Sequence, residues 1–408
     1  MKKRFIENRL TTLFRNFPAV LLTGARQTGK TTLLKSLVSS PSVVTFDPVT
    51  DIQGARAEPD LFLQNLSTPA FLDEVQYSPE VLASLKRYID ERSGQKSLFY
   101  LSGSHNLGVL KGAAESMAGR VAIADLYALC YRELAEKEDH GILEQWLHDG
   151  ADNFSREQED TDTPAVNRLM WRGSMPGILD LGDEVLPDYF SAYLRTYIER
   201  DIRSMAGIQD IGRFGRFVRL LSALSAQEIN ANQLGRELGI DRTTALRWVS
   251  LCESSYQWIQ IPAFSRNSVK KISGKNKGYF TDTGFLCALQ GIFSPQILAS
   301  HPLYGHIFET YIVMEVIKRT AAWMQRPSLH HYRTYQGTEV DLILEYNGTL
   351  FPMEIKLTAK PSAMDARGIQ SLRTTFPKER IGCGLIVCST PKAFPIQQNI
   401  WAVPWWEL

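Results

Sequence analysis

The feature that most constrains the fold is a glycine-rich segment near the N-terminus, Gly24–Thr31, which fits G-x-x-x-x-G-K-[ST] at every fixed position. An apolar run, Ala19–Leu22, precedes this segment, and apolar residues at helical spacing follow it up to Leu37. The order predicts a strand, a tight loop and a helix, with backbone N–H groups that surround a phosphate chain. The alternative is an ordinary glycine turn before a helix.

We expect this loop to bind the phosphates of ATP together with Mg²⁺. Lys30 is predicted to reach the β- and γ-phosphates, and the Thr31 hydroxyl is predicted to ligate the metal ion. The residues predicted to bind the nucleotide are Gly24, Ala25, Arg26, Gln27, Thr28, Gly29, Lys30, Thr31 and Thr32.

A second motif, Phe71-Leu72-Asp73-Glu74, ends an apolar strand in two carboxylates, as hydrolysis beside the phosphates requires. Asp73 is predicted to hold Mg²⁺ through water, and Glu74 to polarise the attacking water as general base. An acidic pair that merely closes a strand is the alternative. The strand candidate Val43–Phe46 lies between the two motifs, as expected when an extra strand is inserted between them. The two motifs together predict an ATPase.

Two further residues are candidates for the reaction. Ser102 follows the strand candidate Leu98–Leu101, and its hydroxyl could sense the γ-phosphate, although such a residue is as often a plain turn residue. Arg120 comes later and is a candidate arginine finger toward a neighbouring subunit of a homo-oligomer, so that hydrolysis would depend on assembly. A solvated or salt-bridged arginine is the alternative reading of Arg120.

The composition predicts a globular chain of more than one domain. A chain of 408 residues is too long for one ordinary core, and 44% hydrophobic with 22% charged residues is typical of globular proteins. Because 45 Lys and Arg face 44 Asp and Glu, nucleic-acid binding would need a local basic patch. Five cysteines without metal-ligand spacing indicate reduced thiols. Neither a secretion signal nor a membrane-spanning run is seen, which predicts a cytoplasmic protein without a membrane partner.

Four segments are predicted along the chain. Residues 1–135 alternate short apolar runs with helical patterns, as in an α/β domain with a parallel sheet. Residues 136–164 are acidic and polar, which predicts a solvated linker or a surface excursion. Residues 165–291 are mainly helical, and residues 292–408 return to mixed α and β. The strand candidates of the first segment are Ala19–Leu22, Val43–Phe46, Ala70–Leu72, Leu98–Leu101 and Val121–Leu126; the last segment has a helix pattern at Gly305–Thr320 and strand candidates at Val340–Glu345, Thr349–Ile355 and Gly384–Cys388.

The chain as a whole resembles the prokaryotic AAA-type ATP-binding proteins that carry a C-terminal domain of unknown function. The resemblance spans roughly residues 1–395 and is carried by Gly24–Thr32, Phe71–Gln76, Leu101–Ser104, Glu115–Arg120, Tyr197–Asp201 and Tyr279–Gly284. It implies a P-loop ATPase core, a winged-helix-like middle region and a nuclease-like C-terminal α/β fold. It implies no particular substrate.

The middle region contains a helix-turn-helix pattern of its own. Residues 232–248 show two helical stretches separated by a turn at Gly239, and Asp241 is placed to cap the second helix. Contact with DNA is one role for residues 230–250, and packing or binding of a partner protein is the other. The side chains that could face a DNA major groove are Arg242, Thr243, Thr244 and Arg247.

A second set of residues with chemical potential, Glu309, Asp341, Glu354 and Lys356, lies toward the C-terminus. Glu354 and Lys356 are two residues apart and should share one face of a strand. Three carboxylates can hold a hard divalent ion, and a lysine beside them can orient water or steady a phosphate. The alternative is that these side chains never meet. The set resembles the PD-(D/E)XK nuclease superfamily in its Asp and Glu-x-Lys pattern, although Val340 stands where that pattern has proline.

These observations leave several functions open, because a fold does not fix a function. The first is an ATP-dependent switch or remodeler whose C-terminal part recognises a protein partner or nucleic acid. The second is an ATP-regulated, Mg²⁺-dependent nuclease. A third is a signalling ATPase whose nucleotide state gates a partner interaction.

Overall fold

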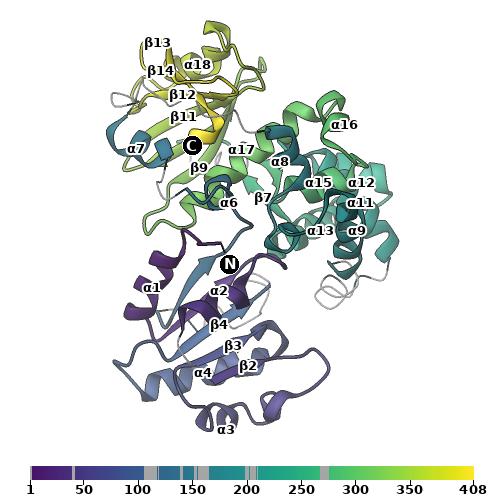
Figure 1. The fold of residues 1–408 in the computed structure, drawn as a ribbon, viewed down its shortest axis with the longest axis vertical. Coiled ribbons are helices and arrows are strands. Elements are labelled where there is room, and N and C mark those ends of the chain that lie inside the picture. The colour runs from purple at the N-terminus through teal and green to yellow at the C-terminus, as the bar shows by residue number, and fades with distance from the viewer. Residues whose placement is uncertain are drawn as a thin grey trace.

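The computed structural model describes residues 2–38, 42–104, 117, 119–137, 141–150, 154, 165–197, 202, 208, 210–266 and 275–408. Residues 115, 116 and 118 of the segment Glu115–Arg120 and residues 198–201 of the segment Tyr197–Asp201 therefore lie outside the described residues. The described part forms three sheets. In Figure 1, the N-terminal sheet lies at the bottom, the C-terminal sheet at the upper left and a largely helical region at the right.

The N-terminal sheet is parallel throughout, in the order β2-β3-β4-β1-β5. This confirms the predicted α/β core with a parallel sheet. Each strand candidate of this segment matches a strand to within two residues at either end. The strands are β1 (Ala19–Thr23), β2 (Ser42–Thr45), β3 (Ala70–Asp73), β4 (Phe99–Gly103) and β5 (Val121–Asp125).

The inserted strand is not the one that the sequence suggested. The strand β2 lies at the edge of the sheet, beside β3, whereas β4 separates β1 from β3. Phe99 of β4 pairs with Ala19 on one side and with Ala70 on the other. Order along the chain does not give order across a parallel sheet, because every connection between parallel strands is a crossover.

Helices cover both faces of this sheet. Leu21 of β1 belongs to a core that includes Leu85 of α4, whereas the next residue, Leu22, belongs to a core that includes Leu34 of α2. Successive side chains of a strand point to opposite faces, so a fully apolar strand indicates a sheet buried on both sides. The helices of this segment are α1 (Glu7–Asn16), α2 (Lys30–Leu37), α3 (Pro59–Gln64) and α4 (Pro79–Glu91), with short 3₁₀ turns η1 (Ile52–Gly54) and η2 (Val75–Tyr77).

The prediction of a solvated linker over residues 136–164 is wrong for its described middle part. Residues Gly141–Asp149 form α7, which follows the short α6 (Tyr131–Leu134). Trp146 of α7 is buried, donates a hydrogen bond to the carbonyl oxygen of Cys383 over 2.9 Å and contacts the ring of Phe351 edge-on. The apolar spacing of Leu143, Trp146 and Leu147 forms one helix face, and this face outweighs the polar composition of the segment. Residues 138–140, 151–153 and 155–164 lie outside the described part.

The middle region is mainly helical, with one small antiparallel sheet in the order β6-β8-β7. The predicted turn at Gly239 is confirmed, since this residue ends α12 with φ 63°. The predicted cap is confirmed as well, since Asp241 accepts the N–H of Thr244 over 2.9 Å at the start of α13. The elements are α8 (Val166–Arg172), η4 (Pro176–Ile178), η5 (Asp183–Val185), α9 (Leu186–Thr196), α11 (Ile211–Ala223), β6 (Gln227–Glu228), α12 (Ala231–Leu238), α13 (Arg242–Ser254), β7 (Trp258–Ile261), β8 (Lys277–Phe280), α15 (Thr283–Leu289) and α16 (Pro295–Ser300).

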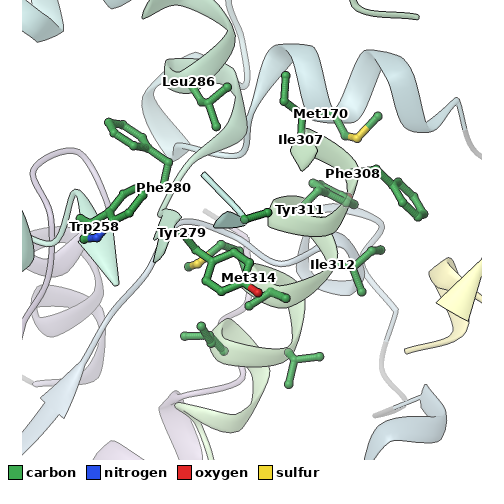
Figure 2. Packing of buried hydrophobic residues seen from close by; sticks show 14 of the residues in the cluster. Met170, Trp258, Tyr279, Phe280, Leu286, Ile307, Phe308, Tyr311, Ile312 and Met314 are labelled. Carbon is green, nitrogen blue, oxygen red and sulfur yellow. The ribbon is translucent and has the colours of Figure 1, made fainter. Parts of the chain in front are cut away.

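The helix α17 (Tyr304–Thr320) joins the middle region to the C-terminal sheet. Its buried residues lie on all sides of the helix, as expected for a helix at the centre of a core. Figure 2 shows side chains of α17, among them Ile307 and Tyr311, beside Tyr279 of β8 and Met170 of α8. One continuous core runs from these residues to the C-terminal strands, so the two regions share their interior.

The C-terminal sheet is mixed, in the order β13-β14-β12-β11-β10-β9. One of its faces belongs to the core of α17, and the other packs against α18 (Arg367–Thr375), with η7 (Ala363–Ala366) leading into that helix. The three strand candidates and the helix candidate of this segment are confirmed to within a residue at either end. The strands are β9 (Ser328–Arg333), β10 (Glu339–Tyr346), β11 (Thr349–Ile355), β12 (Gly384–Cys388), β13 (Phe394–Gln397) and β14 (Ile400–Pro404), followed by η8 (Trp405–Glu407).

Within the described residues, no helix combines the length and the apolar character needed to cross a bilayer.

Candidate functional site

The glycine-rich loop turns sharply at the end of β1. Gly24 and Gly29 have φ of 151° and 88°, values that favour glycine. A Cβ atom at Gly24 would lie 2.1 Å from the carbonyl oxygen of Leu126. A larger residue at this position would therefore displace the backbone directly after β5. Because α2 begins at Lys30, directly after Gly29, the N–H groups of its first turn lie at the loop. The local sequence therefore builds the geometry of a phosphate-binding loop.

Lys30 is held inside the loop. Its Nζ donates hydrogen bonds to the carbonyl oxygens of Gly24 and Ala25 over 2.9 and 2.7 Å, and its side chain is buried. Arg4 supports the loop from behind, since its guanidinium donates to the carbonyl oxygen of Thr28 over 3.0 Å. The ammonium thus lies at the centre of the loop, within hydrogen-bond distance of backbone carbonyl oxygens.

Thr31 and Asp73, which the sequence separates by 42 residues, meet beside the loop. The Thr31 hydroxyl donates to Oδ2 of Asp73 over 2.9 Å, and the Ser102 hydroxyl donates to Oδ1 of the same carboxylate. Ser102 lies within β4 and is fully buried, so in this structure it positions Asp73. A hydroxyl and a carboxylate are the hard oxygen ligands that Mg²⁺ prefers. Their roles toward Mg²⁺ and the γ-phosphate stay predictions.

Glu74 stands in an unusual backbone conformation directly after β3. Its φ of 57° and ψ of 46° place it in the left-handed region, which costs on the order of 1 kcal/mol for a residue with a Cβ atom. Gln76 donates a hydrogen bond from Nε2 to the Glu74 carboxylate and another to the Ser104 hydroxyl, the latter over 3.0 Å. These contacts orient the carboxylate, while its role as general base stays a prediction.

Arg120 lies away from this loop. It immediately precedes β5, at the amino end of the sheet, whereas the loop lies at the carboxyl end. A five-residue strand separates the two ends by roughly 15 Å. The guanidinium forms an ion pair with Asp90, with Nε 2.6 Å from Oδ1. The salt-bridged alternative therefore holds within one chain, and a role in hydrolysis could only be played toward a neighbouring subunit.

A cleft of about 570 Å³ opens over the loop, and residues from two regions of the chain line it. Tyr189 of α9 lies close to the loop, since a Cβ atom at Gly177 would be 2.9 Å from its hydroxyl and 3.1 Å from Oε1 of Gln27. This hydroxyl is buried without a hydrogen-bond partner among the described residues, and burial raises the pKa of Tyr189 to about 12. No motif or spacing in the sequence predicted this wall. The lining residues are Arg26, Gln27, Gly29, Lys30, Thr31, Thr32 and Glu74 on one side and Pro176, Gly177, Tyr189, Ala192, Tyr193 and Thr196 on the other.

A polar junction lies directly before the loop and joins all three regions. Tyr256 lies 2.7 Å, hydroxyl to hydroxyl, from Thr23 and donates to Asp125 at the end of β5 over 2.8 Å. Arg326 donates to the other oxygen of Asp125, also over 2.8 Å. Burial by itself would raise the pKa of Asp125, but the hydrogen bonds from Arg326 and Tyr256 outweigh it and hold the pKa below its ordinary value. An acid at the carboxyl end of a strand was the only sequence signal for this junction.

The C-terminal residues Glu309, Asp341, Glu354 and Lys356 do come together. Lys356 lies 3.0 Å from Glu354 and 3.6 Å from Asp341, which confirms that the acid and the lysine share a face. A second lysine, Lys277 of β8, joins them from the middle region, with Nζ 2.6 Å from Glu309 and 3.4 Å from Asp341. The five side chains alternate in charge in the order Glu309, Lys277, Asp341, Lys356, Glu354, and we call them the acid–lysine cluster.

Burial and neighbouring charges shift the pKa values of the carboxyl groups in the acid–lysine cluster. Burial raises the pKa of Glu354 well above its ordinary value, and the neighbouring Asp341 charge adds to the effect. Burial alone would raise the pKa of Asp341 too, but Lys277 and Lys356 outweigh it and lower that pKa. Burial and the Asp341 charge also raise the pKa of Glu309, to about 8, although Lys277 opposes them.

The predicted metal site formed by Glu309, Asp341 and Glu354 is not what the structure contains. No group of three His, Cys, Asp or Glu side chains in the described part of the chain is arranged to hold a metal ion. The physical reason is Lys277, whose ammonium lies between Glu309 and Asp341. No sequence spacing pointed to Lys277, because it is 64 residues from Asp341.

Comparison with known families divides the chain into three matched parts. Residues 16–135 match an AAA domain, residues 163–296 a domain of unknown function (DUF8612), and residues 304–408 another domain of unknown function (DUF4143). Two uncharacterized proteins, Mb2031c of Mycobacterium bovis and Rv2008c of Mycobacterium tuberculosis, are each 28% identical over 406 residues, covering 99% of this chain and 84% of theirs.

Among solved structures, the Walker-type ATPase PABY2304 of Pyrococcus abyssi is 14% identical, with a TM-score of 0.43 over 70% of this chain and 94% of that chain. The match of residues 16–135 agrees with the parallel sheet and with the phosphate-binding loop described above. The resemblance seen in the sequence is thereby confirmed in its coarse form. Residues 16–135 thus match an AAA domain with a phosphate-binding loop, and residues 304–408 match a C-terminal domain of unknown function.

Proposed function

We propose that this protein binds and hydrolyses ATP at Gly24–Thr32 and acts as a nucleotide-dependent switch or remodeler on a protein or nucleic-acid partner. The observation that carries the proposal is the double lining of the cleft: the loop forms one wall, and η4 and α9 of the middle region form the other. A nucleotide in this cleft would contact both regions at once. Loss of its terminal phosphate would therefore change the contact between them.

The residues at the loop fit the proposed chemistry. Thr31 and Asp73 would hold Mg²⁺, which supplies positive charge to the phosphates when it is bound. Lys30 would stabilise the negative charge that develops at the transferred phosphoryl group. Glu74, oriented by Gln76, would take a proton from the attacking water. The buried Tyr189 hydroxyl would donate its hydrogen bond to the nucleotide.

The polar junction offers a route from the loop to the other regions. Thr23 directly precedes Gly24 and contacts Tyr256, which in turn bonds Asp125 together with Arg326. A shift of the loop on nucleotide binding would alter these contacts. Partner binding would then respond to the nucleotide through residues 230–250 or through the C-terminal region. On α13, Arg242 and Thr243 are exposed, as such a role requires.

Two substitutions test the proposal. We expect Lys30→Ala to abolish ATP turnover and weaken ATP binding, whereas Lys35→Ala, an exposed lysine on the same helix, should behave as the wild type. Glu74→Gln should bind ATP without hydrolysing it. Hydrogen exchange over α9 should slow on adding ATP to the Glu74→Gln protein. Unchanged exchange over α9 at saturating ATP would contradict the switch, and ATP turnover by Lys30→Ala would contradict the site.

Assembly into a homo-oligomer is part of the proposal, because Arg120 cannot reach the loop of its own chain. A mixture of Lys30→Ala and Arg120→Ala proteins tests it. If Arg120 completes a neighbour's site, each variant alone should be inactive, and the mixture should regain turnover. A mixture as inactive as its components would show that Arg120 takes no part in the reaction.

Location in the cytoplasm also stays a proposal.

The nuclease alternative rests on the convergence of Glu309, Asp341, Glu354 and Lys356 alone. We favour the switch, since the carboxylates of that set already face lysines. Incubation with DNA or RNA and Mg²⁺ or Mn²⁺, with and without ATP, distinguishes the two. Cleavage that Lys356→Ala abolishes would favour the nuclease.

A further inference from the structure

Lys277 reaches from the middle region into the carboxylates of the C-terminal region. It is the first residue of β8, its side chain is 5% exposed, and its Nζ lies 2.6 Å from Glu309. Tyr279 follows two residues later and donates to the same carboxylate over 2.8 Å. Because side chains two apart share a face, β8 presents an ammonium and a hydroxyl side by side to Glu309. This contact lies between α17 and the small sheet of the middle region.

A divalent ion shared by Glu309 and Asp341 would need oxygen atoms of both within roughly 2.0–2.6 Å of its centre. The ammonium of Lys277 already lies at the point that faces both carboxylates. The second oxygen of Asp341 accepts the N–H of Ile355 over 2.8 Å and lies 3.6 Å from Lys356. Both oxygens of Asp341 are thus engaged by donors of the chain itself.

Lys277 also connects two regions of the chain through its ion pairs. Glu309 lies on α17 and Asp341 on β10, while Lys277 lies on β8, so its ion pairs connect elements of both regions. Removing one partner of a buried ion pair leaves an uncompensated charge and is strongly destabilising. The lysine therefore stabilises the contact between regions as well as balancing charge.

We infer that Lys277 is a built-in cation that takes the place of a divalent metal in this nuclease-like arrangement, so that the C-terminal region holds the regions together and does not cleave nucleic acid. This inference concerns the acid–lysine cluster alone and does not depend on ATP hydrolysis at the loop.

The test is Mn²⁺ binding, measured by electron paramagnetic resonance on nucleotide-free protein. All proteins carry Asp73→Asn, which removes the carboxylate predicted to hold metal at the loop. We expect the parent to bind no Mn²⁺ at the cluster, and Lys277→Met to bind it with a Kd at least about tenfold lower than any binding by the parent. Lys277→Arg, which keeps the cation, should behave as the parent. Adding Asp341→Asn to Lys277→Met should abolish the new binding.

Thermal unfolding gives a second readout. Lys277→Met should melt about 5–10 °C below the parent, because buried carboxylates lose their partner. Mn²⁺ should restore part of this loss in Lys277→Met and none in Lys277→Arg. A folded Lys277→Met protein that binds no Mn²⁺ would overturn the inference.

The wild-type protein keeps the inference testable if Lys277→Met does not fold. Tight Mn²⁺ binding by the parent that Glu309→Gln or Asp341→Asn removes would overturn it. So would Mg²⁺- or Mn²⁺-dependent cleavage of DNA or RNA by the wild type that is lost in Lys356→Ala. Absence of both is the expected result.

Discussion

The nucleotide cleft and the acid–lysine cluster both contain lysine and carboxylate side chains, but the lysines in the two places have different contacts. In the cleft, Lys30 donates to backbone carbonyl oxygens at the edge of an open volume of about 570 Å³. In the cluster, Lys277 and Lys356 face carboxylates directly, and Asp341 and Glu354 are almost completely buried. Lys30 thus contacts backbone carbonyl oxygens of an open loop, whereas Lys277 and Lys356 contact buried carboxylates. The difference lies in the partners of the lysines, which residue type and spacing do not show.

The largest expected effect concerns ATP hydrolysis in the nucleotide cleft. Glu74→Gln should lower the kcat of ATP hydrolysis about 10²–10⁴-fold, the usual contribution of a general base. ATP affinity should change little, because Glu74 acts on water rather than on the nucleotide. Phosphate release and equilibrium ATP binding measure the two quantities. Glu80→Gln, an exposed acid at the start of α4, serves as control, and equal turnover by both variants would refute the assignment.

On the cluster's side, Asp341→Asn should lower the free energy of unfolding by about 3–5 kcal/mol, since Lys277 and Lys356 would both lose a buried carboxylate. Urea denaturation followed by tryptophan fluorescence measures the loss. The exposed Asp149, changed to asparagine, should alter stability by no more than about 0.5 kcal/mol. A similar small change for Asp341→Asn would mean that the cluster does not stabilise the fold.

A smaller effect is expected at the polar junction, which links the two sides. Tyr256→Phe removes the hydroxyl between Thr23 and Asp125 and should cost about 1–3 kcal/mol, as for a buried hydrogen-bond partner left unpaired. The rise in melting temperature on adding ATP should also shrink if the junction transmits nucleotide binding. Tyr335→Phe, on a fully exposed ring, is the matched control. An unaltered ATP-dependent shift in Tyr256→Phe would exclude the junction from coupling.

The smallest effect concerns pH. Glu354 has a raised pKa in the folded protein, so between its ordinary value of 4.5 and the raised value the folded state binds a proton that the unfolded state lacks. Stability contributed by this proton is complete below pH 4.5 and is lost as the pH rises toward the raised value. Glu354→Gln has no such proton to lose. The free energy of unfolding, measured from pH 5 upward, should therefore fall less steeply for Glu354→Gln than for the wild type. Parallel curves would show that Glu354 does not carry this proton.

Local sequence predicted what depends on local geometry. The loop at Gly24–Thr31, the cap at Asp241 and the turn at Gly239 are each set by a few neighbouring residues, and their conformations follow the predictions. Strands also followed, because apolar runs bounded by turn residues carry their own signal. The helix α7 was missed, since three apolar side chains in an acidic segment changed its average composition little.

Contacts between distant segments could not be predicted in the same way. The sequence supplied Thr31, Asp73 and Ser102 as candidates, but only the order of strands across the sheet placed them on one carboxylate. The wall formed by Tyr189 over the loop comes from a segment more than a hundred residues away. Neither spacing nor composition records such an approach.

The sequence by itself determined that this chain has a P-loop core, because a phosphate-binding loop needs glycine conformations and a helix start within one short segment. It also determined which acids and lysines are available to the C-terminal region. Only the tertiary structure decided what those acids face. The packing of β8 against α17 and β10 brings Lys277 to Glu309 and Asp341, and a buried carboxylate takes the nearest cation that the fold supplies.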